Sequence, residues 1–178
     1  MSGRTGRPIG DLRPGDQRAG DLRARMPLLD RLVDEDPQKT QDDPLSVSQA
    51  HADLLRGVRR DLEALLNARR PWKPLPEGHE VLTRSPLGFG LPDFAAGAFN
   101  QQSRRERLRD EIRQALNLFE RRLSHVEVDL LPVQLSDPTL RLRIRAQLNV
   151  DPAPMPVGFD MTVDPRTDEF EVRQGRDV

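Results

Sequence analysis

The sequence lacks cysteine and tyrosine altogether, and it contains only one tryptophan and six phenylalanines among 178 residues. The absence of cysteine excludes disulfides, thiol catalysis and thiolate metal sites, and it fits a reducing compartment such as the cytoplasm. Apolar runs extend over only a few residues, so we expect neither a membrane-spanning helix nor a secretory signal. The low aromatic content also disfavours a surface on which RNA bases stack.

The chain also lacks an excess of charge of either sign, because 28 basic residues nearly balance 29 acidic ones. No overall positive field is therefore available to recruit nucleic acid or an anionic membrane. Hydrophobic residues make up only 35% of the chain and charged residues 32%. This length and composition predict one compact domain with a polar surface and solvated tails.

The chain divides by composition into three parts. Residues 1–25 repeat Arg, Asp, Gly and Pro with few apolar side chains, which predicts a disordered tail. Residues 26–45 form a short docking segment and linker, and residues 46–178 the folded domain. The docking segment holds one apolar turn that is too short to be stable alone, so it docks either on the domain or on a partner. The apolar turn lies within residues 26–33 and includes Leu28, Leu29 and Leu32.

The first amphipathic helix is expected to begin at Ser46, which stands three residues before Gln49 at capping-box spacing. Arg70 suits the negative end of this helix, and Pro71 stops it. Apolar residues recur along it at helical intervals: Leu54, Val58, Leu62 and Leu65.

A second amphipathic helix is expected from Ser103, with Glu106 at the capping-box position, to about Arg121 or Arg122. Its predicted buried face comprises Leu108, Ile112, Ala115, Leu116 and Phe119.

After the second helix the period of the apolar pattern changes to two, which predicts strands. The clearest example is Leu140–Leu148, where every second residue is apolar and the other face carries three arginines. Further strands are expected at 126–130, 157–163 and 170–172. We therefore predict an α+β fold, with two amphipathic helices packed on one face of a small, mainly antiparallel four-stranded sheet.

The sequence does not identify a catalytic or metal-binding site. The carboxylates that a glycosidase pair would need are Glu120, Glu127, Asp129 and Asp93, and nothing in the sequence selects two of them. The three histidines are far apart and have no ligands at metal spacing, so we expect no metal and no cofactor. The arginines at 141, 143 and 145 form either a solvated face or a surface for phosphates or carboxylates.

The connection over residues 71–100 carries five prolines and four glycines, which disfavours regular structure. Loops of this length within a domain usually serve a function. Two alternatives stand: Phe89 and Phe94 pin the loop to the core, or the loop is exposed and binds a partner.

Four stretches, in order along the chain, resemble the TssE family of type VI secretion systems. The family is related to a baseplate wedge protein of contractile phages and carries the label gene-25-like lysozyme. The stretches are Leu28–Leu32, Val58–Asn67, Gly90–Phe94 and Phe119–Leu123.

This resemblance implies a cytoplasmic structural protein in a membrane-docked baseplate. Its implied partners are the wedge subunits TssF, TssG and TssK and the contractile sheath, with no nucleic acid and no membrane insertion. The alternative is a peptidoglycan hydrolase associated with the same machine.

The family's Glu-Pro-Arg signature falls on Glu120, Arg121 and Arg122, so arginine stands in the place of proline. We predict that Glu120 and Arg122 set a partner contact beside an open sheet edge and that Arg121 faces solvent. The other expected partner-binding residues are Phe89, Leu91, Pro92, Asp93, Phe94, Leu28, Leu29 and Leu32.

Overall fold

The computed structural model describes residues 32, 46–71, 78, 80–93, 101–132, 139–150, 153–164 and 167–175. The predicted tail at 1–25, most of the docking segment with Leu28 and Leu29, and Phe94 lie outside the described residues. Leu32, the one described residue of the docking segment, is 71% exposed. The chain divides into two compact units, residues 1–57 and 58–178, with the boundary inside helix α3; the fold below is that of the second unit together with that helix.

Helix α3 (Val47–Asn67) begins as predicted. The amide of Ser46 donates to the side-chain oxygen of Gln49, and the amide of Gln49 donates back to the Ser46 hydroxyl, which completes the capping box. The helix ends at Asn67 rather than at Arg70. Beyond it, the backbone at residues 68–70 forms two hydrogen bonds with Leu91 instead of continuing the helix.

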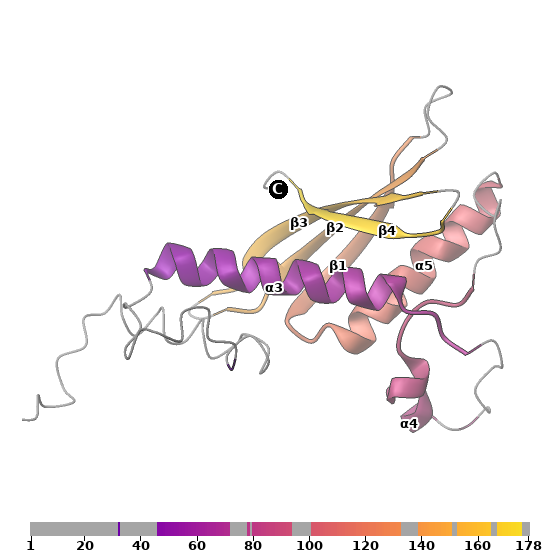
Figure 1. The fold of residues 1–178 in the computed structure, drawn as a ribbon, viewed down its shortest axis with the longest axis horizontal. Coiled ribbons are helices and arrows are strands. Elements are labelled where there is room, and N and C mark those ends of the chain that lie inside the picture. The colour runs from indigo at the N-terminus through magenta and orange to yellow at the C-terminus, as the bar shows by residue number, and fades with distance from the viewer. Residues whose placement is uncertain are drawn as a thin grey trace, which may run out of the picture. The chain divides into compact units, whose positions relative to one another are not determined.

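The sheet contains four antiparallel strands in the order β1-β2-β3-β4: Leu123–Leu130, Leu140–Leu148, Met155–Val163 and Phe170–Gln174. Together with the helices this is the predicted α+β fold (Figure 1). Alternation places one face of each strand in the core, and β2 buries Leu140, Leu142, Ile144, Ala146 and Leu148. Strand β1 starts earlier than expected because a bulge between Ser124 and Glu127 interrupts its alternation.

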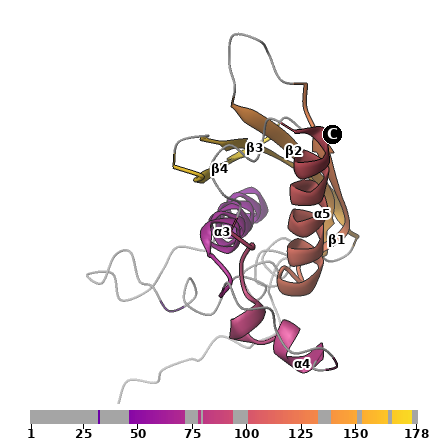
Figure 2. The same cartoon turned by 90° about the vertical axis from the view of Figure 1, so that its right-hand side faces the viewer.

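Helix α5 (Gln102–Phe119) lies along β1 on the face that the helices cover (Figure 2). It buries Leu108, Ile112, Ala115 and Leu116, as predicted. Phe119, which was also predicted to be buried, is only half-buried. The predicted capping box was wrong, because Ser103 lies inside the helix and Glu106 accepts a hydrogen bond from Gln102. The helix also ends at Phe119, before the two arginines that were expected to close it.

The connection between the helices is more regular than its composition suggested. It contains the short helix α4 (Glu80–Thr83) and the 3-10 turn η1 (Pro86–Gly88). Leu91, which follows them, is fully buried. No helix within the described part of the chain combines the length and the apolar character needed to cross a membrane.

Candidate functional site: the junction between α5 and β1

A tight turn connects α5 to β1. The Glu120 amide donates to the Leu116 carbonyl (2.9 Å), which completes the helix, and the Glu120 carbonyl accepts from the Leu123 amide (3.2 Å). Arg121 therefore occupies the second position of a four-residue turn, where proline is favoured in the common turn types. Its side chain is exposed, as predicted.

Glu120 is the buried polar residue of the junction, with 7% of its surface exposed. Arg122 binds it in a fork, because Nε donates to Oε1 (2.7 Å) and Nη2 donates to Oε2 (2.5 Å). The Arg122 amide also donates to Oε1 (3.1 Å). Two parallel N–H bonds from one planar guanidinium make this pair strong and geometrically specific.

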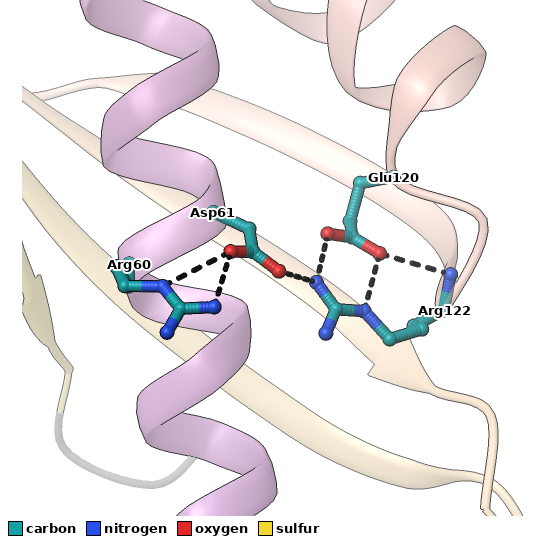
Figure 3. Close-up of polar contacts among 4 residues, drawn as sticks. All are labelled: Arg60, Asp61, Glu120 and Arg122. Atoms are coloured by element: carbon teal, nitrogen blue, oxygen red, sulfur yellow. Dashed lines mark hydrogen bonds and ion pairs between the residues drawn. The ribbon is translucent and has the colours of Figure 1, made fainter. Parts of the chain in front are cut away.

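Helix α3 contributes a second carboxylate to the same cluster (Figure 3). Asp61 Oδ2 accepts from Arg122 Nη2 at 2.7 Å, and Asp61 Oδ1 accepts from Arg60 Nη2 at 3.0 Å. Two carboxylates thus meet two guanidiniums, and the cluster is close to neutral. Burial opposes the charge on Arg122, but its hydrogen bonds and attraction to Glu120 and then Asp61 outweigh this effect and raise the pKa of its guanidinium.

The cluster connects elements that are distant in sequence. Asp61 belongs to α3, Glu120 caps the end of α5, and Arg122 leads into β1, so the cluster fixes the second half of α3 against the α5–β1 junction. Glu120 and Arg122, predicted to set a partner contact, face each other and Asp61. A contact of this junction with a partner stays a prediction.

Sequence reasoning missed Asp61, although the residue lies in a stretch that carries the family resemblance. Its neighbours on α3 are charged as well, and no local pattern indicates which of them turns towards residue 122. One polar atom of the cluster, Arg122 Nη1, is buried without a hydrogen-bond partner among the described residues.

The predicted partner-binding loop is divided between the core and the surface. Phe89 is 38% exposed and meets Phe119 edge-on, with ring centroids 5.3 Å apart. Leu91 is fully buried, Pro92 is half-buried and Asp93 is exposed. The structure therefore makes Leu91, rather than Phe89, the residue that anchors the loop to the core.

The other candidate carboxylates lie apart from Glu120. Glu127 and Asp129 are on β1, where Arg145 bridges them at 3.2 and 2.8 Å. Arg143 of the same basic face pairs with Asp160 of β3 at 2.7 Å. These cross-strand pairs favour the solvated face over the phosphate-binding surface, because the guanidiniums already have carboxylate partners.

The two edges of the sheet differ. On β4, Asn67 of α3 accepts from the Phe170 amide and donates to the Phe170 carbonyl, both at 2.9 Å. Arg59 of α3 donates to the Val172 carbonyl at 3.2 Å. Side chains of α3 therefore occupy three of the outward backbone groups of β4 and close this edge to a further strand.

The edge of β1 is open within the described part of the chain. The Leu131 amide donates to the Arg141 carbonyl, so the antiparallel alternation turns the backbone groups of Val128 and Leu130 away from β2. No hydrogen bond within the described residues occupies these outward groups. The junction with Glu120 and Arg122 leads directly into this open strand.

Comparison with known families gives a match over the middle of the chain. A family model described as baseplate wedge protein gp25 matches residues 52–153, which is more than half of the chain. The matched range includes the Asp61, Glu120 and Arg122 cluster, helix α5 and strands β1 and β2. Comparison with curated proteins finds no match.

Proposed function

Because the chain belongs to the family of the baseplate wedge protein gp25, we propose that it is a non-enzymatic wedge subunit of a type VI secretion baseplate. In this role it joins the subunits TssF, TssG and TssK and helps to initiate assembly of the contractile sheath. It acts in the cytoplasm, within a baseplate that is docked to the membrane.

The open β1 edge is the observation that carries this proposal beyond the family assignment. A sheet edge with free N–H and C=O groups accepts an added strand, and backbone pairing then supplies affinity. Because Asn67 and Arg59 close the β4 edge, the β1 edge is the one that an incoming strand can join within the described part of the sheet. Arg121 is exposed in the turn just before β1, and its positive charge would help to align the incoming strand.

The proposal of a non-enzymatic role rests on the ion pairs that the candidate catalytic carboxylates form with arginines. Both oxygens of Glu120 accept hydrogen bonds from Arg122, so this carboxylate is already paired with a guanidinium of the same chain. Glu127 and Asp129 share Arg145 on the outer face of the sheet. A retaining or inverting glycosidase needs two carboxylates that converge across one bond, one of them a proton donor.

Co-purification separates the structural role from the hydrolase alternative. The full chain, tagged and expressed together with the other wedge subunits, is expected to elute with them in a stable complex. The same purified protein, incubated with peptidoglycan, is expected to release no more muropeptides than buffer does. Sustained hydrolysis that disappears in Glu120→Gln, together with elution of the chain alone, would favour the hydrolase.

A change at the β1 edge tests the proposed contact. Leu130 is half-buried at the end of β1, and its amide points outward, so Leu130→Pro removes an edge donor without breaking the β1–β2 ladder. We expect the variant to keep its circular dichroism spectrum and to lose the wedge complex. A folded variant that still co-purifies at the level of the unchanged protein contradicts the role of this edge.

A further inference from the structure

The segment 80–93 leaves large apolar side chains in water. Val81 is 82% exposed, Leu87 52% and Phe89 38%. Within the described part of the chain, the only other large apolar residues this exposed are Leu32 and Val47. Three of the five exposed large apolar residues in the described part of the chain therefore lie in this one short segment.

Internal contacts hold this segment in one shape. The Ser85 hydroxyl donates to the Leu82 carbonyl (2.7 Å) and accepts from the Leu87 amide (3.2 Å), which joins α4 to η1. Gly88 packs so closely that a Cβ atom there would lie 2.1 Å from the Thr83 carbonyl oxygen. The exposure of Val81 and Leu87 is thus a property of a fixed backbone.

The segment is also fixed to the domain at its far end. Leu91 is fully buried, and its backbone accepts from the Arg70 amide and donates to the Ala68 carbonyl, both at 2.9 Å. Phe89 rests edge-on against Phe119 at the end of α5. Figures 1 and 2 show α4 standing away from the strands. A rigid surface of this kind binds with a smaller loss of conformational entropy than a flexible loop.

Two cations flank the apolar residues. Arg84 lies between Val81 and Leu87 in sequence. Arg121 comes two residues after Phe119, whose ring packs against Phe89. Both side chains are exposed, and neither has a hydrogen-bond or ion-pair partner among the described residues. The segment 80–93 contains two carboxylates, Glu80 at the start of α4 and Asp93 after the buried Leu91. The charged side chains that the structure describes as exposed beside Val81, Leu87 and Phe89 are the two arginines.

We propose that Val81, Leu87, Phe89, Arg84 and Arg121 form a docking surface, the α4 surface, for one segment of a neighbouring baseplate protein. The segment carries apolar side chains flanked by Asp or Glu, which match the apolar residues and the two arginines. This inference rests on the proposed function, since it assigns a partner class to a wedge subunit.

Charge argues against two other occupants. In a symmetric pair of two copies, the α4 surface would face itself and bring the two arginines of each copy close to those of the other, which like charges disfavour. An anionic membrane is usually recruited by four to eight clustered cations, and this surface has two.

A photo-crosslinking residue at position 87 tests the proposal in the full chain, co-expressed with the other wedge subunits. We expect crosslinks to one subunit, within a peptide that holds apolar residues beside Asp or Glu. The same residue at Arg107, an exposed position on α5, is the matched control and is expected to give no such crosslink.

Affinity measurements on the purified complex supply the second readout. Val81→Ser with Leu87→Ser is expected to weaken binding about tenfold or more, and Arg84→Glu is expected to weaken it and to reduce its dependence on salt. The control changes Val47→Ser and Arg107→Glu should have little effect.

The outcomes separate this inference from the proposed function. The complex could form, the α4-surface variants bind as tightly as the unchanged protein, and the crosslinker at position 87 give no crosslink to a wedge subunit. The α4 surface is then not a docking site, although the wedge role stands. Crosslinks only to a second copy or to lipid overturn the inference in favour of those occupants. Failure of the unchanged chain to join any wedge subunit refutes the proposed function itself.

Discussion

Replacing Glu120 by glutamine should weaken the fold of the isolated protein, because Glu120 is an internal brace. The change removes the negative charge from a buried residue that is 7% exposed and leaves Arg122 with Asp61 alone. Breaking a fully buried ion pair on one side costs about 3–5 kcal/mol. The Arg122 side chain is 19% exposed and keeps its 2.7 Å contact to Asp61, so we expect a loss of about 2–3 kcal/mol of unfolding free energy.

Urea unfolding of the full chain, followed by circular dichroism, measures this loss. With a slope of about 2 kcal/mol per molar urea, the midpoint of Glu120→Gln should fall by about 1–1.5 M. The matched control is Glu127→Gln, which removes a carboxylate that is 65% exposed and shares Arg145 with Asp129. Exposed pairs contribute less than about 1 kcal/mol, so its midpoint should barely move. Equal midpoints for the two variants would refute the brace.

Three further changes test the fold around the site. Arg121→Pro should stabilise the protein by about 0.4–1 kcal/mol. The reason is that residue 121 is at the second position of a turn and its amide makes no hydrogen bond within the described residues. Thermal melts measure this effect, and a lower melting temperature would contradict the turn geometry. Asn67→Ala should cost about 1–2 kcal/mol, since it frees both backbone groups of Phe170. It should also produce concentration-dependent association by light scattering, and a variant that remains monomeric at every concentration would show that Asn67 does not protect this edge. Ile144→Asp should prevent folding because it buries a charge in the core, whereas Arg143→Asp should leave a folded protein; similar losses of thermal stability would mean that the strand register is wrong.

The strands and the helix cores were predictable because their signals are local. Along β2, each apolar residue alternates with a polar or charged one, and a period of two fixes which face is buried whatever the neighbouring elements are. The start of α3 was predictable for a similar reason, since Ser46 and Gln49 complete each other's hydrogen bonds within one turn. The same reasoning failed at Ser103, where the local signal was present but the helix begins earlier.

The arrangement of the site was less predictable because it depends on contacts between distant residues. The family signature identified Glu120 and Arg122, but nothing near them in sequence indicates that Asp61 completes their cluster. Likewise, the pattern of the loop did not reveal that Leu91 is buried while Leu87 is exposed. Burial in an irregular segment is decided by the surface on which it packs, and that surface exists only in the folded chain.

Sheath assembly in cells tests the proposed wedge role most directly. A strain that lacks this protein, with a fluorescently labelled sheath subunit, is expected to form no sheaths in time-lapse microscopy. The unchanged protein should restore them, and Leu130→Pro should not. Normal numbers of sheaths in the deletion strain would contradict the account, because a machine that polymerises its sheath without this subunit does not need it as a wedge component.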